Sequence, residues 1–162
     1  MYVTSSRNPS LETRRFCKLF SFLIPRGAFE PRGAKTVEKV CARARKLGKM
    51  RALIVSEKHS LPAALSFLET DAEWNWLEPK IELKKITWKK IPGKGESPEN
   101  AAVEGGAAGK VSGLFDFAPV ECEEDVLLVN AEGDSLSFAF NGKEMLLMNV
   151  AYTHINEKRE GA

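Results

Sequence analysis

The sequence predicts an α/β fold in which a compact α/β segment is followed by antiparallel hairpins. In residues 1–60, helix-period apolar stripes alternate with short apolar runs. The run at 52–55 is apolar throughout, which is typical of a strand covered on both faces. Further along, Glu132-Gly133 and Asn141-Gly142 separate alternating strands and are strong hairpin signals. The length of 162 residues suits one domain.

The first strand and helix are predicted from capping signals and apolar spacing. A short strand at residues 2–4 precedes a helix that begins near 8–10, capped either by Asn8 ahead of Pro9 or by Ser10. Pro25 ends this helix, because proline lacks the N–H that the next turn needs. The buried stripe follows the i, i+3, i+4, i+7 pattern and comprises Phe16, Leu19, Phe20 and Leu23.

A second strand and helix follow the same pattern. The strand is expected around Phe29, with a turn at Arg32-Gly33 and a helix capped by Thr36. Gly48 is a suitable stop, since glycine readily takes the left-handed conformation that closes a helix. The run at 52–55 then forms the third strand. The buried stripe of the second helix comprises Val37, Val40, Cys41 and Ala44.

The rest of the chain favours strands. Residues 92–113 are rich in Gly, Ala, Pro and Glu and predict either a short helix after Ser97-Pro98 or a mobile segment. One more helical turn is expected within 112–117, and a polar tail begins at 156. Strands are expected at 63–69, 73–77, 82–90, 126–130, 135–140 and 144–152.

Charge is distributed unevenly along the chain. Residues 1–60 carry 14 Lys and Arg against 4 Asp and Glu, a net charge of +10. Residues 61–162 carry 10 against 18, a net charge of −8, which returns the formal +2 of the whole chain. A basic half joined to an acidic half favours a polyanion-binding surface. An unevenly charged soluble surface is the plainer alternative.

Composition also bounds the cellular setting. No segment approaches the ~20 apolar residues of a membrane helix, and the start lacks the regions of a signal peptide. We therefore expect a cytoplasmic protein without membrane contact. Cys17, Cys41 and Cys122 show no CxxC spacing and suit free thiols in a reducing compartment.

The stretch TSSRNPSLETRRF, residues 4–16, crowds hydroxyl groups and arginines where the first strand gives way to the first helix. A helix N-terminus has unpaired N–H groups and a partial positive charge, and both favour an anion. Arg7 precedes the helix, and Arg14 and Lys18 share its polar face. A phosphate site and a capped helix with a solvated basic face both fit this pattern.

This stretch closely resembles the opening signature of the Brix-domain family of ribosome-biogenesis proteins, roughly T-S-R-x-P-S-x-x-T-R-x-F. Pro31-Arg32-Gly33 resembles the second marker of that family, and Pro62 opens a strand in the expected place. The resemblance is close over residues 3–68 and looser to about 153. The family often has glycine before Pro62, whereas this chain has His59-Ser60-Leu61, which argues against a tight glycine turn there.

The resemblance implies two related α/β halves, each similar to the anticodon-binding domain of class II aminoacyl-tRNA synthetases. The best trace of the repeat is Ile86-Thr87-Trp88 followed by Ser97-Pro98, which echoes the opening strand and helix start. The implied layout is a single Brix domain at 1–162, with a basic half at 1–80, an acidic half at 81–155, a boundary within 78–85 and a polar tail at 156–162.

The resemblance further implies a compact archaeal-type, non-enzymatic factor that binds ribosomal RNA precursors and assembly proteins, without cofactor, metal or small-molecule substrate. If the two helices lie on one side of the sheet, their basic faces would form one RNA-backbone surface. Arg7 and Arg32 could instead hold loops by bonding backbone carbonyls. The candidate contacts are Arg7, Arg14, Arg15, Lys18, Arg32, Lys35, Lys39 and Arg43.

The alternatives are an enzyme and a protein-binding module. No HxxxH, GxSxG or P-loop pattern is present, which disfavours an enzyme. The acidic half could recruit a basic ribosomal protein or assembly factor, with Trp74, Trp76 and Trp88 as interface anchors or as core residues. An acidic cluster lacks His or Cys at metal-ligand spacing and is interpreted as a solvated loop. It comprises Asp116, Glu121, Glu123, Glu124 and Asp125.

Overall fold

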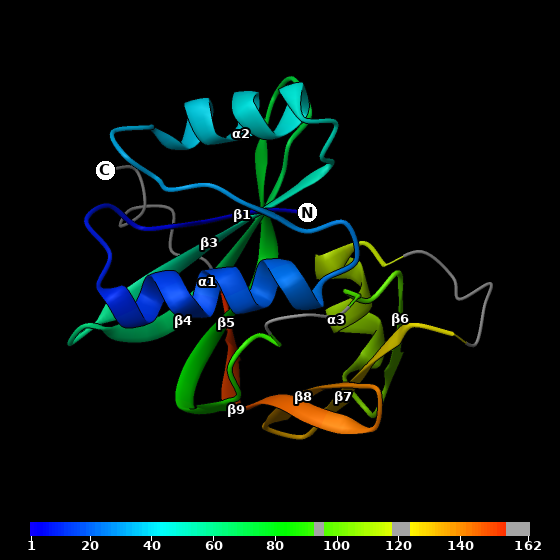
Figure 1. The fold of residues 1–162 in the computed structure, drawn as a ribbon. Helices are drawn as coiled ribbons and strands as arrows, with labels where there is room; N and C mark the ends of the chain where they lie inside the picture. The colour runs from blue at the N-terminus through cyan, green and yellow to red at the C-terminus, as the bar shows by residue number, and fades with distance from the viewer. Residues whose placement is uncertain (93–95, 118–123, 155–162) are drawn as a thin grey trace.

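The computed structural model describes residues 1–92, 96–117 and 124–154. Within these residues, nine strands form one mixed sheet in the order β2-β1-β3-β4-β5-β9-β8-β7-β6, accompanied by three helices (Figure 1). The predicted α/β class is confirmed. The elements are β1 (Tyr2–Ser5), α1 (Leu11–Leu23), β2 (Ala28–Phe29), α2 (Val37–Lys46), β3 (Arg51–Lys58), β4 (Leu61–Glu69), β5 (Asn75–Trp88), β6 (Asn100–Glu104), α3 (Ala108–Phe115), β7 (Val126–Glu132), β8 (Ser135–Phe140) and β9 (Lys143–Thr153).

The strand–helix–strand–helix–strand order of the first half is confirmed. Strands β1, β2 and β3 are parallel, with β1 between the other two. Of the two caps considered for α1, Ser10 is the one found, since its side chain accepts a hydrogen bond from the backbone N–H of Thr13. Thr36 caps α2 in the same way, through the backbone N–H of Lys39. Gly48 follows α2 with a φ of 72°, as a left-handed helix stop requires.

Helices α1 and α2 lie on opposite faces of the sheet (Figure 1). Val3 and Leu53 belong to the core that contains α1, whereas Tyr2 and Ala52 belong to the core that contains α2. Successive residues of a strand point to opposite faces, so each helix covers its own face. The condition for one continuous basic surface over both helices is therefore not met.

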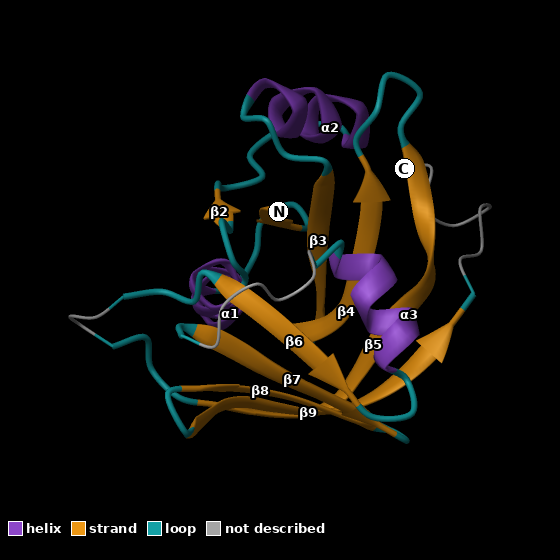
Figure 2. Cartoon of the chain, turned by 90° about the vertical axis from the view of Figure 1, so that its right-hand side faces the viewer, coloured by secondary structure: helices purple, strands orange, loops and turns teal. Residues whose placement is uncertain are grey.

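The second half repeats the first in a shorter form. Strands β6 and β7 are parallel and α3 lies between them in the chain, while β7, β8 and β9 are antiparallel (Figure 2). This order matches β1, α1, β3, β4 and β5, without counterparts of β2 and α2. The counterpart of the opening strand is thus β6, and the sequence trace at Ile86-Thr87-Trp88 was a wrong alignment of the repeat.

Two strand predictions were wrong. The strands expected at 73–77 and 82–90 are the single strand β5. Pro79 does not interrupt it, because Pro79 lies where the register with β4 shifts between the pairs Phe67–Leu77 and Leu65–Ile81. Strand β6 occupies a segment expected to be helical or mobile, because parallel pairing with β7 outweighs the helix preference of its alanines.

Both halves share one large core. The ring of Phe20 on α1 lies 6.0 Å from that of Phe115 on α3 and 5.3 Å from that of Phe138 on β8. Trp88 packs against Phe16 at 5.5 Å, and Trp74 and Trp76 pack against the smaller core under α2. The tryptophans therefore act at least in part as core residues. No helix in the described segments is long and apolar enough to cross a membrane.

Candidate nucleic-acid interface

The hydroxyl groups of the opening stretch are engaged inside the protein. The Thr4 hydroxyl donates to the carbonyl of Glu30 at 2.8 Å, and the Ser5 hydroxyl donates to the carbonyl of Ser6 at 2.8 Å. The Ser10 hydroxyl donates to the carbonyl of Ser60 at 2.8 Å. These bonds join β1 to the loop after β2, and the start of α1 to the β3–β4 turn.

A carboxylate of the chain occupies the anion position at the start of α1. Glu57 accepts hydrogen bonds from the Thr13 hydroxyl at 2.6 Å and from the Ser10 backbone N–H at 3.0 Å. These two bonds, that of Thr13 first, lower the pKa of Glu57 below its ordinary value. The start of α1 is thus satisfied internally, which favours the capped-helix interpretation over a phosphate at this point.

The β3–β4 turn is tight although it lacks glycine. Lys58 pairs directly with Leu61, and His59 and Ser60 between them have φ values of 52° and 63°. Two consecutive positive φ values are those of a type I′ turn, which suits the twist of antiparallel strands. The expectation from the missing glycine was therefore wrong. The bond from the Ser10 hydroxyl to Ser60 helps to hold this turn against α1.

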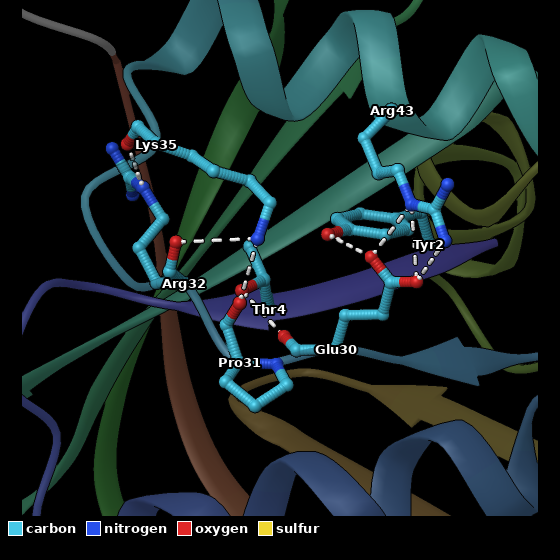
Figure 3. Close-up of polar contacts among 7 residues, drawn as sticks. All are labelled: Tyr2, Thr4, Glu30, Pro31, Arg32, Lys35 and Arg43. Carbon is cyan, nitrogen blue, oxygen red and sulfur yellow. Dashed lines mark hydrogen bonds and ion pairs between the residues drawn. The ribbon is translucent and has the colours of Figure 1, made fainter.

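Arg32 and Lys35 hold the loop that leads from β2 to α2 (Figure 3). Arg32 is 7% exposed, and its guanidinium donates to the carbonyls of Lys35 at 2.6 Å and Ser5 at 3.3 Å. Lys35 donates in turn to the carbonyl of Pro31 at 3.0 Å. Burial, and then the charge of Arg7, lower the pKa of Arg32. The loop-holding alternative for Arg32 is the one that the structure displays.

Arg43 is committed to an ion pair. Its Nε and Nη2 atoms donate to the Glu30 carboxylate, with the shortest contact at 2.7 Å, and the Tyr2 hydroxyl donates to the same carboxylate at 3.0 Å (Figure 3). The Arg43 hydrogen bonds are the largest cause of a lowered pKa for Glu30. Arg15 is paired more loosely, with Glu12 at 2.9 Å on the exposed side of α1. Neither cation is a free phosphate contact in this state.

Four predicted cations remain exposed: Arg7, Arg14, Lys18 and Lys39. They have no hydrogen-bonding or ion-pairing partner in the segments that the structure covers. Each helical residue advances about 100°, so Arg14 and Lys18 lie about 40° apart, opposite the buried stripe of α1. Lys39 is on α2 and so belongs to the other face of the sheet.

The structure adds one cation that the sequence did not single out. Lys58 is exposed at the end of β3, and the bonds of Glu57 and Ser60 to Ser10 bring this turn to the start of α1. The pairing of the turn with the helix depends on distant residues, so spacing carried no signal of it. We define the α1 surface as Arg7, Arg14, Lys18 and Lys58.

The α1 surface begins at the carboxyl ends of the parallel strands. The loop after β1 leads to α1 on one face, and the loop after the neighbouring strand β2 leads to α2 on the other. Such a divergence between neighbouring parallel strands is where α/β sheets commonly bind ligands. Arg7 and Arg32 lie in these two loops, one exposed and one buried.

The other chemical candidates are buried or lie outside the described residues. Burial raises the pKa of Cys17 to about 12 and that of Cys41 to about 11. Cys122, Glu121 and Glu123 lie outside the described residues. Among the His, Cys, Asp and Glu side chains that are described, no group could hold a metal ion.

Comparison with known proteins supports the fold. No family model and no curated protein sequence matches the chain. A probable ribosomal biogenesis protein from Aeropyrum pernix K1 is 18% identical, with a TM-score of 0.78 over 93% of this chain and 94% of that chain. Mil, an archaeal Imp4-like protein, is 19% identical, with a TM-score of 0.65 over 93% of this chain and 96% of that chain. The resemblance predicted from the opening stretch is confirmed as a shared fold.

Proposed function

We propose that this chain is a non-enzymatic ribosome-biogenesis factor of the cytoplasm that binds ribosomal RNA precursors and assists their processing and the assembly of ribosomal subunits. The observation that carries the RNA-binding part is the α1 surface, where exposed cations stand without internal partners beside a fully bonded scaffold. The fold shared with a probable ribosomal biogenesis protein supports the cellular role.

The charge distribution supports the same proposal. Phosphate contacts need cations that are not already neutralised, and Arg14 and Lys18 meet this requirement on one helix face. Glu57 takes up the N–H groups at the helix start, so the contact with RNA would be made by side chains along α1. The repeated strand–helix–strand order supports the expected similarity of each half to an anticodon-binding domain, itself an RNA-binding unit.

Arg32, Lys35 and Arg43 have a supporting role in this proposal. Arg32 ties the ends of β1 and β2 together and thereby positions Arg7 beside α1. Arg43 fixes α2 to the end of β2 through Glu30. Arg15 could exchange Glu12 for a phosphate, because this exposed pair contributes little stability, about 0–1 kcal/mol. Lys39 would contact a different segment of the RNA.

A protein-binding function is the second candidate. Leu128 on β7 is 53% exposed, and its neighbours across the sheet are Ala102 on β6 and Ala139 on β8. This small apolar area lies in the acidic half and could contact a basic ribosomal protein or assembly factor. It would complement RNA binding by the basic half.

Cross-linking in living cells tests the proposal. The tagged full chain is irradiated in its native cells, and the attached RNA is sequenced. We expect fragments of precursor ribosomal RNA to be enriched over other abundant RNA, and the enrichment to fall in the Arg14→Ala, Lys18→Ala double variant. A matched variant, Lys84→Ala with Lys85→Ala, removes two exposed charges from β5 and should cross-link normally. An RNA profile without ribosomal precursors would contradict the proposal.

A further inference from the structure

A cavity of about 450 Å³ lies where the two halves meet, at the end of the molecule away from the start of α1. One wall is formed by the turn after α1 and the residues that lead into β3. The opposite wall is formed by the start of β6 and the end of α3, which face β3 in Figure 2. Protein cavities of ~300–1,000 Å³ commonly hold small ligands.

The two walls carry opposite charges. Arg26, Lys49 and Arg51 line the wall of the basic half, and Glu99 and Asp116 line that of the acidic half. Lys49 already donates to the carbonyl of Arg26 at 2.7 Å, which fixes its ammonium at the rim. A ligand that fits must therefore present an anionic group on one side and hydrogen-bond donors on the other.

Arg51 is the least satisfied charged group of this cavity. Its side chain is 16% exposed, and its Nε is buried without a hydrogen-bond partner in the described part of the chain. Its Nη1 lies 3.4 Å from the Glu69 carboxylate, and its Nη2 lies 3.9 Å from that of Asp116. A guanidinium has five donors, and a buried donor left unpaired is costly. Arg51 can thus still donate to an anion.

The cavity also offers a flat apolar surface. The ring of Phe117 stacks on that of Phe115, with centroids 5.1 Å apart and planes 5° from parallel. Both rings line the cavity, together with Ile24 and Ala101. A planar heterocycle can pack against such a surface by stacking. An anion, a planar ring and N–H donors are the three parts of a nucleotide.

We propose that this cavity binds one guanine nucleotide, with the phosphate on Arg51 and Lys49 and the N1–H and N2–H donors of the base on Asp116 or Glu99. Guanine suits this wall because it presents two neighbouring donors to a carboxylate. The same chemistry is offered by a free nucleotide and by an unpaired guanosine in RNA. The RNA form of the proposal rests on the proposed function, whereas the free-nucleotide form does not.

Titration of the full chain with guanosine monophosphate, adenosine monophosphate and inorganic phosphate, followed by calorimetry, tests the site. We expect the guanosine nucleotide to bind at least tenfold more tightly than the other two probes. Asp116→Asn should abolish the preference for guanine, since asparagine tolerates the left-handed backbone of this position, with φ 54°, but lacks the charge. Arg51→Gln should weaken every probe that carries phosphate.

Matched variants separate the site from the rest of the molecule. Glu82→Gln removes an exposed charge from β5 and should bind as the wild type does. The Arg14→Ala, Lys18→Ala double variant should also keep its affinity for the nucleotide, so failure of the α1 surface and failure of the cavity can be told apart. If the wild type does not bind the guanosine nucleotide, or binds it equally well after Asp116→Asn and Arg51→Gln in folded protein, the proposal is overturned.

Two RNA oligonucleotides distinguish the sources of the ligand. One carries a single unpaired guanosine in a loop, and the other carries cytidine at that position. Tighter binding of the first, lost after Asp116→Asn, supports an RNA nucleotide in the cavity. Binding of free nucleotide with no difference between the two RNAs keeps the cavity as a nucleotide site and overturns its RNA form.

Discussion

Glu57 takes the place at the start of α1 that a bound anion would otherwise occupy. Its carboxylate accepts from both the Ser10 N–H and the Thr13 hydroxyl, and so completes the capping of the helix from a neighbouring strand. The hydroxyls that make the opening stretch distinctive are therefore structural, and the cations between them are left to face solvent. This division of roles is set by individual side chains.

Replacing Glu57 with Gln should destabilise the protein. The lost cap interaction is worth about 0.5–2 kcal/mol of unfolding free energy, which denaturant titration at pH 7 measures. Because the folded pKa of Glu57 is lowered from 4.5, its contribution is present above that pH and declines as pH falls below it. The difference from wild type should thus shrink at pH 3. A constant difference, or one no larger than that of Glu82→Gln, would contradict this role.

The buried cysteines should be inert in the folded protein. Burial raises the pKa of Cys17 to about 12 and that of Cys41 to about 11, so neither forms a thiolate near neutrality. In a Cys122→Ser variant at pH 8, a thiol reagent should label neither residue within minutes and should label both after denaturation. Since both pKa values are raised from 9.0, stability should fall as pH rises from 9 toward 11 and 12. Rapid labelling of folded protein would exclude this account.

Elements were predicted well where the signal is local. The buried stripes of α1 and α2, the caps Ser10 and Thr36, and the hairpin turns at Gly133 and Gly142 depend on residues close in sequence. The face covered by each helix depends on the strand order β2-β1-β3, since right-handed crossovers running in opposite directions place their helices on opposite faces. Spacing gives no strand order, and so the two basic helix faces could not be placed.

The candidate site was predicted in part for the same reason. The exposed position of Arg14 and Lys18 follows from the periodicity of α1. The ion pair of Arg43 requires Glu30, which lies in another element, and the burial of Arg32 requires the end of β1. Whether a cation is free or engaged is a property of tertiary contacts, and this is why the sequence grouped free and engaged cations together.

The β3–β4 turn offers a test at the scale of elements. His59 and Ser60 both have positive φ, which costs a residue with a Cβ about 1–2 kcal/mol relative to glycine. The His59→Asn, Ser60→Gly double variant places the preferred type I′ sequence in the turn and should raise the thermal unfolding midpoint. The His59→Ala, Ser60→Ala variant is the control and should not raise it. A midpoint lowered by the Asn-Gly turn would contradict the assigned turn geometry.

The whole molecule separates its charges while sharing its core. The basic half carries the α1 surface, the acidic half carries the exposed Leu128, and Phe20, Phe115 and Phe138 join the two halves internally. One rigid core can therefore present an RNA-binding side and a protein-binding side in a fixed relation. Binding of RNA to the basic side would be steered by its +10 charge and opposed by high salt.

The salt dependence of RNA affinity tests the central claim, that RNA binds across the α1 surface. Affinity for a structured ribosomal RNA fragment is measured at several salt concentrations for wild type, for Arg14→Ala with Lys18→Ala, and for the control Lys84→Ala with Lys85→Ala. Two lost phosphate contacts should lower the slope of log affinity against log salt by about 1.4–1.8, and should weaken RNAs of different sequence alike. The control variant should keep the wild-type slope. Equal affinity and equal slope in the α1 variant would place the RNA elsewhere and contradict the claim.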